Sequence, residues 1–94
     1  MMTKGGAMKL TGRITVHGDK PASSAVVEIH NSQGDVVDQV QVDDDGRYTY
    51  HLAEGTWTLN VWDSHGHRGN AAVELTEGSD REVNLDLAEP AEGH

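Results

Sequence analysis

Residues 42–59, VDDDGRYTYHLAEGTWTL, decide the fold of this chain. The acidic turn Asp45-Gly46 opens the alternating segment Arg47–Leu52, and a second short turn leads into the alternating segment 56–63. Alternation with a period of two indicates a strand with one buried face, and glycine after aspartate supplies the backbone freedom of a tight hairpin. The stretch therefore predicts two consecutive antiparallel strands and places the chain among small all-β proteins.

The same alternation continues on both sides of this hairpin. Turn-forming residues separate further segments with a period of two, which are 9–17, 24–30, 36–42, 71–76 and 81–87. Together with the hairpin they predict seven short strands, a number typical of an all-β, antiparallel β-sandwich with an Ig-like architecture.

The strands define one domain with short extensions. We expect a β-sandwich at 9–87, between a flexible N-terminal arm at 1–8 and a C-terminal tail at 88–94. Residues 18–22 and 64–70 are rich in glycine and polar residues without a period, so both are predicted to be turns or loops.

Strand parity predicts which side chains enter the core, because successive side chains point to opposite faces of a sheet. In segment 36–42, parity directs Val36, Val40 and Val42 inward. In the first and last strands it directs Lys9 and Asn84 outward.

Composition excludes several classes of function. The 94-residue chain has no cysteine, which removes disulfides, thiolate nucleophiles and cysteine-ligated metal sites. Sixteen acidic residues against seven lysines and arginines give a formal charge of −9, and such a surface repels nucleic acid and anionic lipid. We find no run of transmembrane length and no apolar centre of a signal peptide in the first ten residues. We therefore expect no nucleic-acid partner and no membrane insertion.

A set of short motifs spans residues 10–87. The motifs are Gly12, Pro21-Ala22, VVEI at 26–29, DGRY at 45–48 and EGTWTLNV at 54–61. This pattern resembles the carboxypeptidase regulatory-like domains, which are grouped with the transthyretin-like and Cna-B-like sandwiches. The resemblance implies a β-sandwich that serves as a spacer, binding or assembly module in something larger.

Residues 62–68 contain the candidate binding residues. Trp62 follows the inward Val61, so its indole is predicted to point away from the core, where aromatic side chains anchor interfaces or stack on sugar rings. His65, His67 and Arg68 follow closely and complete the predicted contact set. An equally consistent interpretation is that Trp62 covers an edge of the sandwich.

Two polar turns contain side chains that can bind metal ions. Asp63 precedes His65 and His67, and the turn at 43–45 offers three consecutive carboxylates. Zinc needs further ligands, and three adjacent aspartates lack the alternate spacing of a calcium loop. We therefore assign no residue as a metal ligand and predict no cofactor. Metal binding at either turn remains an alternative.

The sequence does not predict an enzyme. Transthyretin-related hydrolases end in a Tyr-Arg-Gly-Ser motif at the active site, whereas this chain ends in EPAEGH at 89–94. A small hydrolase that uses the outward-facing His17, Arg47 and His51 remains one alternative.

We expect a non-catalytic structural or interaction module. The specific expectation is an accessory decoration protein on a larger assembly such as a bacteriophage particle, with a capsid or tail protein as its partner. The second alternative is a cell-surface or secreted module that binds carbohydrate or protein. Localisation is open between a virion and a cell surface.

Overall fold

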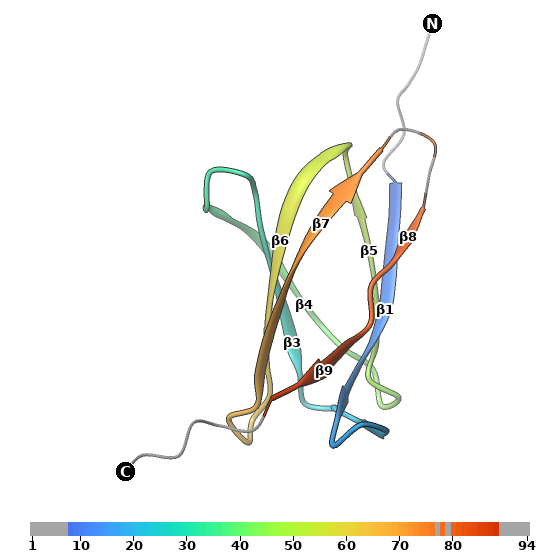
Figure 1. The fold of residues 1–94 in the computed structure, drawn as a ribbon, viewed down its shortest axis with the longest axis vertical. Coiled ribbons are helices and arrows are strands. Elements are labelled where there is room, and N and C mark those ends of the chain that lie inside the picture. The colour runs from blue at the N-terminus through green and yellow to red at the C-terminus, as the bar shows by residue number, and fades with distance from the viewer. Residues whose placement is uncertain (1–7, 77, 79, 89–94) are drawn as a thin grey trace, which may run out of the picture.

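The computed structural model of the chain describes residues 8–76, 78 and 80–88. Its strands are β1 (Met8–Val16), β2 (Lys20–Pro21), β3 (Val26–His30), β4 (Val36–Gln41), β5 (Arg47–Leu52), β6 (Gly55–Trp62), β7 (Arg68–Leu75), β8 (Arg81–Glu82) and β9 (Leu85–Leu87). They form two sheets that pack face to face (Figure 1), so the predicted β-sandwich is confirmed. Within the described ranges, no helix is long and apolar enough to cross a membrane.

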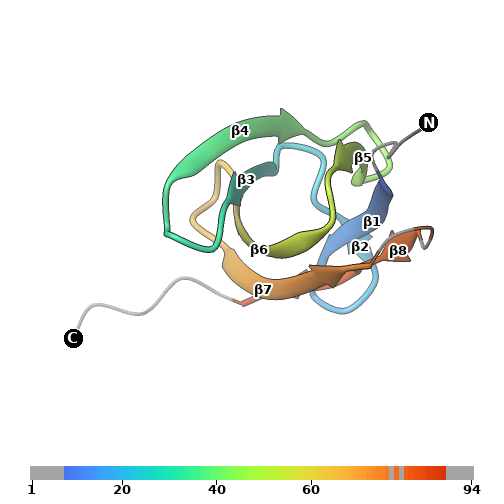
Figure 2. The ribbon, with the colours of Figure 1, turned by 90° about the horizontal axis from the view of Figure 1, so that it is seen from above.

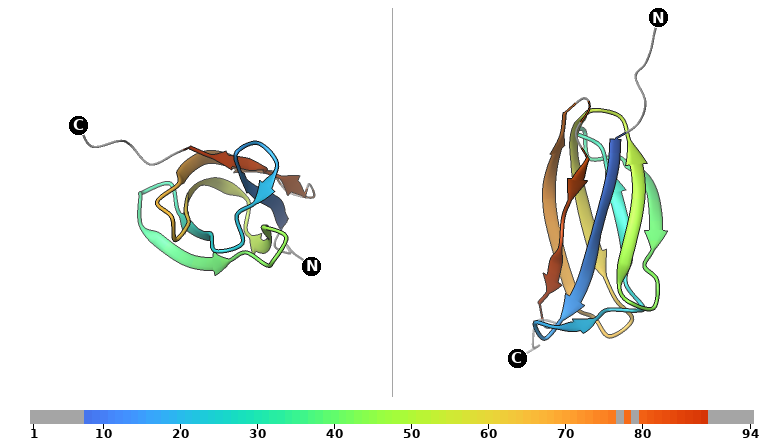
Figure 3. Two further views of the ribbon diagram at one scale, coloured as in Figure 1. Left: turned by 90° about the horizontal axis from the view of Figure 1, so that it is seen from below. Right: turned by 90° about the vertical axis from the view of Figure 1, so that its right-hand side faces the viewer.

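Strand β1 organises the first sheet. Along one edge it pairs antiparallel with β5 over residues 8–13 and then with β2 at Thr15 and Val16. The last two strands, β8 and β9, pair with β1 in parallel (Figure 3). The prediction of one antiparallel strand at 81–87 was therefore wrong in detail. The chain leaves β7 in the second sheet, crosses to the first sheet and then follows β1 in two short pieces.

The second sheet has the strand order β4-β3-β6-β7 and is antiparallel throughout. Seen from above, the two sheets curve around a common core (Figure 2). A backbone bridge joins them at one corner, where the Arg68 N–H donates to the Ala88 carbonyl at 3.1 Å and the Ala88 N–H donates to the Arg68 carbonyl at 2.8 Å. Ala88 is thus the first residue of the predicted tail, and the rest of that tail, 89–94, lies outside the described residues.

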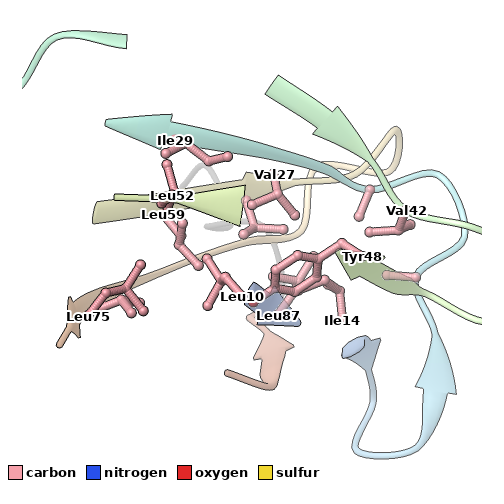
Figure 4. Close-up of a cluster of buried hydrophobic side chains, with 14 of the residues drawn as sticks. Leu10, Ile14, Val27, Ile29, Val42, Tyr48, Leu52, Leu59, Leu75 and Leu87 are labelled. Carbon is pink, nitrogen blue, oxygen red and sulfur yellow. The ribbon is translucent and has the colours of Figure 1, made fainter. Parts of the chain in front are cut away.

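The core lies between the two sheets and consists of aliphatic side chains with one tyrosine (Figure 4). Burial of such side chains supplies the main driving force for folding. The fully enclosed residues of large volume are Leu10, Ile14, Val27, Ile29, Leu59, Val61, Val73 and Leu75. Met8 is also buried and is the first residue of β1, although the prediction placed it in the N-terminal arm. The other residues of that arm, 1–7, lie outside the described residues.

The β3–β4 hairpin differs from the parity prediction. Val36 was expected in the core, but it is 54% exposed and Val37 is 47% exposed. A shift in pairing register between Ile29 and His30 lies next to them, and the hairpin projects away from the first sheet (Figure 1). Farther along β4 the expected face resumes, with Val40 partly buried against the core.

Asp38 lies on the same face of β4 as Val40, which packs against the core, and it links the two sheets. Its carboxylate accepts a hydrogen bond of 2.5 Å from the Tyr50 hydroxyl on β5. This bond lowers the pKa of Asp38 and raises that of Tyr50. An inward-pointing charge on an edge strand also discourages pairing with another chain.

Two predicted loops are partly strands. Residues 20 and 21 form β2 because they pair with β1, and the loop predicted at 64–70 ends earlier because β7 begins at Arg68, opposite Trp62. Strand formation depends on the tertiary context as well as on residue type, so glycine and polar residues can form strands where a neighbouring strand offers hydrogen-bond partners.

Gly12 lies where β1, β5 and the β8–β9 connection meet. The Tyr48 ring crosses the space that a side chain at residue 12 would occupy, and its hydroxyl donates to the Val83 carbonyl at 2.8 Å. The Val83 N–H donates to the Thr11 carbonyl at 2.8 Å. A β-carbon at Gly12 would lie 1.8 Å from the Val83 carbonyl oxygen, so the position admits only glycine.

Replacing Gly12 with alanine is expected to lower the free energy of unfolding by about 3 kcal/mol or more, because the backbone of β1 or of Val83 must shift. Urea denaturation followed by circular dichroism measures the loss. Thr49→Ala on the exposed face of β5 is the control and should change stability by less than about 0.5 kcal/mol. Equal stability of the two variants would contradict the close packing at Gly12.

Candidate functional site

The structure divides the four predicted contact residues between two depressions. Trp62 and Arg68 line a groove on the outer face of the second sheet. His65 and His67 line a second depression at the end of the sandwich, together with His17. The sequence neighbours therefore do not form one surface, because the turn between β6 and β7 separates the outer face of the sheet from its end.

The first depression, here called the Trp62 groove, has a volume of about 610 Å³. The register of β6 and β7 aligns Trp62 with Arg68 in one row across the sheet. The adjacent row consists of Glu28, Asn60 and Asn70. A half-buried indole thus lies beside a carboxylate, two amides and a guanidinium on one face of three strands.

Hydrogen bonds hold the polar side of the groove in place. Glu28 Oε1 lies 2.7 Å from His30 Nε2, and Gln39 Nε2 donates to Glu28 Oε2 at 3.1 Å. Asn60 Nδ2 lies 3.0 Å from the same His30 nitrogen, whose other ring nitrogen lies 3.3 Å from the Gly34 carbonyl. Side chains that are already oriented lose less conformational entropy when a ligand binds.

Sequence analysis did not identify Glu28, Asn60 or Asn70. Glu28 and Asn60 are polar residues on the outward parity of predicted strands, and that signal is present in the sequence, whereas Asn70 lies in the loop predicted at 64–70. Their alignment into one row depends on strand pairing, because β3 places Glu28 opposite Asn60, more than thirty positions away, and β7 places Asn70 on the other side of Asn60. The groove therefore becomes visible only once the register is known.

At the end of the sandwich, Asp63 and His67 form a buried pair. Asp63 is 6% exposed and His67 is 9% exposed. The Asp63 Oδ1 accepts the backbone N–H groups of His65 at 2.9 Å and His67 at 2.8 Å, and Oδ2 lies 2.7 Å from His67 Nδ1. Asp63 thus closes the β6–β7 turn by bonding both its backbone and a side chain.

The environment of Asp63 favours its charged form. Burial alone would raise the pKa of this carboxyl, but the hydrogen bonds from His67 and His65, together with the charge of His67, outweigh burial and lower the pKa. Edge-on ring contacts place His17 5.5 Å and His65 6.3 Å from His67, measured between ring centroids.

Neither candidate metal turn assembles a ligand set in the described part of the chain, where no three His, Cys, Asp or Glu side chains are placed to hold a metal ion. In the other turn, Asp43 Oδ1 accepts the backbone N–H groups of Asp45 and Arg47, each at 2.9 Å. Asp43 thereby stabilises the hairpin turn before β5.

The residues of the hydrolase alternative lie in different places. His17 lines the depression beside His67, whereas Arg47 lines a groove on the outer face of the first sheet. His51 lies opposite Lys9 near the other end of β5. The fold thus spreads these three residues over the two ends of the first sheet instead of converging them on one cavity.

Asp63→Ala is expected to destabilise the protein by about 1–3 kcal/mol at neutral pH, since it removes the bonds that close the β6–β7 turn. The native pKa of Asp63 is lowered, so its contribution is present above the unfolded-state pKa of about 4 and is lost as pH falls below it. Urea denaturation between pH 7 and pH 2 should show the two proteins converging in acid. The exposed Asp44→Ala is the control, and a pH-independent gap between Asp63→Ala and wild type would contradict this account.

The fold recurs in solved structures, including two DUF3823 family proteins and a 5-hydroxyisourate hydrolase. A DUF3823 family protein from Parabacteroides merdae is 22% identical with a TM-score of 0.65, and the match covers 92% of this chain and 48% of that one. A second DUF3823 family protein, from Bacteroides ovatus, is 16% identical with a TM-score of 0.68 and coverages of 88% and 45%. The 5-hydroxyisourate hydrolase of Klebsiella pneumoniae is 18% identical with a TM-score of 0.62 and coverages of 90% and 92%.

These identities establish similarity of fold alone, and this chain spans about half the length of either DUF3823 protein. None of the curated proteins matches the chain. A sequence model of the carboxypeptidase regulatory-like domain matches residues 9–88, which is most of the chain. The chain therefore belongs to the carboxypeptidase regulatory-like domain family, as the motifs in its sequence indicated.

Proposed function

We propose that this domain is a non-catalytic interaction module that contacts its partner through the Trp62 groove. The observation that carries the proposal is the position of Trp62, half-buried in a groove whose Glu28 carboxylate is held by hydrogen bonds with His30 and Gln39. Aromatic side chains in partly enclosed positions contribute a large share of binding energy at protein interfaces. Glu28, Asn60 and Arg68 supply the surrounding polar contacts that give such an interface its specificity.

The proposal that the domain acts as a module has separate support. The fold matches about half of each DUF3823 protein, so it occurs there as one part of a longer chain. A β-sandwich of this kind presents its outer faces while its core remains occupied by aliphatic side chains. The separation of His17, Arg47 and His51 favours binding over hydrolysis.

The specific form of the proposal is an accessory protein that decorates a larger assembly, such as a bacteriophage particle, and docks on a capsid or tail protein. The small size of the chain and its formal charge of −9 fit an outward-facing accessory domain that keeps neighbouring particles apart. The Trp62 groove provides the docking surface in this arrangement.

Carbohydrate binding is a second candidate function, and one observation favours it. The Trp62 indole lies beside the Asn60 and Asn70 amides and the Glu28 carboxylate. A flat aromatic ring next to amides and a carboxylate can stack on the apolar face of a sugar and bond its hydroxyl groups.

Trp62→Ala is expected to release the protein from its partner, because it removes the aromatic anchor of the groove. In a density gradient of source material, the tagged wild type should sediment with a species far larger than 10.2 kDa, whereas Trp62→Ala should remain near the top. Glu54→Gln, in the exposed turn between β5 and β6 and outside the grooves on both sheets, should sediment as the wild type does.

Circular dichroism of each variant distinguishes lost binding from lost folding. A wild type that sediments as a small free species would contradict the decoration role. A glycan array then tests the second candidate: Glu54→Gln should retain the bound sugar and Trp62→Ala should lose it. Wild-type sedimentation by Trp62→Ala would contradict the assignment of the groove.

A further inference from the structure

The outer face of the first sheet is chemically different from the Trp62 groove. There the register of β1 and β5 places Lys9 opposite His51, Thr11 opposite Thr49 and Arg13 opposite Arg47. Like charges directly opposite each other in a sheet repel and destabilise the pairing. A row formed by two arginines is therefore unexpected in a chain with a formal charge of −9.

The neighbouring strands do not neutralise this row. On the side of β1 opposite β5, every second residue from 80 to 86 is acidic except one. The exception is Asn84, so an amide instead of a carboxylate lies beside Arg13. Among the described residues, no carboxylate lies within 4.0 Å of the Lys9 ammonium or of the Arg13 and Arg47 guanidinium groups.

The adjacent acids already bond other groups. Asp86 Oδ1 accepts from the Thr15 hydroxyl at 2.9 Å and from the Gly18 N–H at 3.0 Å. Asp80 Oδ1 accepts the Lys9 backbone N–H at 3.1 Å. Glu82 is the one acidic side chain that lines the groove between these cations.

Hydrogen-bond donors predominate at the arginine row. Asn84 Oδ1 accepts the Arg13 backbone N–H at 2.9 Å, which leaves the amide NH₂ of Asn84 as a donor. Arg13 Nε donates to the Asp45 carbonyl at 3.1 Å, and this bond holds the guanidinium while its other N–H groups remain available. Arg47 is exposed on the opposite strand. Two guanidinium groups and an amide thus surround a position suited to a carboxylate.

We propose that this groove, with a volume of about 520 Å³, binds an extended acidic segment of a partner polypeptide. The arginine row receives one carboxylate of that segment, and Lys9 receives a second. Lys9 and Arg13 are four residues apart on one strand, a distance of about 13 Å, so a single small anion cannot reach both. The same distance separates residues i and i+4 of an extended peptide.

Glu82 makes the groove selective among anionic ligands. Its register partner is Thr11, so its carboxylate lies between Lys9 and the arginine row. An evenly charged polymer such as a nucleic acid would place a phosphate close to Glu82. An acidic peptide with a neutral residue at its centre avoids this repulsion. This inference is independent of the Trp62 groove, which lies on the other sheet.

An NMR titration with two synthetic peptides tests the proposal. Acetyl-Glu-Thr-Ser-Thr-Glu-amide carries its carboxylates four residues apart, and acetyl-Thr-Glu-Ser-Glu-Thr-amide carries them two apart. The first peptide is expected to shift the amide signals of residues 9–13 and 47–51 at millimolar concentration and to bind more tightly than the second. Added salt should weaken this binding, because the contacts are ionic and exposed.

Arg47→Gln is expected to weaken binding of the first peptide by about fivefold, the loss of one exposed ion pair. The Arg47 side chain makes no hydrogen bond to another described residue, and its removal ends the repulsion of Arg13, so the variant should be at least as stable as the wild type. Arg81→Gln is the control, since Arg81 pairs with Leu10 and does not line the groove.

Three outcomes would overturn the proposal. The first is no shift of the β1 and β5 signals, and the second is equal binding by Arg47→Gln and Arg81→Gln. The third is a matching pattern of shifts with inorganic phosphate at the same concentration, which would identify a simple anion site. Preference for the peptide with four-residue spacing, together with loss in Arg47→Gln, supports the acidic segment.

Discussion

The first sheet depends on the absence of a side chain at Gly12. Because this position is empty, the Tyr48 ring lies across β1 and its hydroxyl satisfies the Val83 carbonyl, which points inward from the break between β8 and β9. Burial raises the pKa of the Tyr48 phenol, and the charge of Glu82 raises it further, so the hydroxyl remains a donor. The last strands can therefore follow β1 closely and close the sandwich.

The same break determines the chemistry of the outer surface. Where β8 stops, the Asn84 side chain takes over the bond to the Arg13 N–H, and an amide rather than an acid comes to lie beside the arginine row. On the other sheet, regular antiparallel pairing aligns Asn60 with its neighbours beside Trp62. One sheet thus presents an aromatic and polar groove, and the other presents a cationic groove on an acidic protein.

Much of the fold could be predicted from the sequence, because alternation is a local property that repeats every two residues. Parity correctly assigned Val42 and Val61 to the core. It failed at Val36, which lies beside a shift in register where local alternation no longer reports which face is covered. The sequence could not show that the predicted contact residues lie on two surfaces, because the turn between β6 and β7 carries His67 into a buried pair with Asp63, away from Trp62.

The sequence by itself determined the class of fold, the family, the identity of most core residues and the acidic character of the chain. Turn residues and period-two alternation act within a few positions, so they can be read without a structure. Only the tertiary structure decided that the strand after β7 runs parallel to β1, and that Glu28, Asn60 and Trp62 share one groove while Arg13 and Arg47 share another. Those groupings depend on cross-strand register between distant segments, which is set by the packing of the whole core.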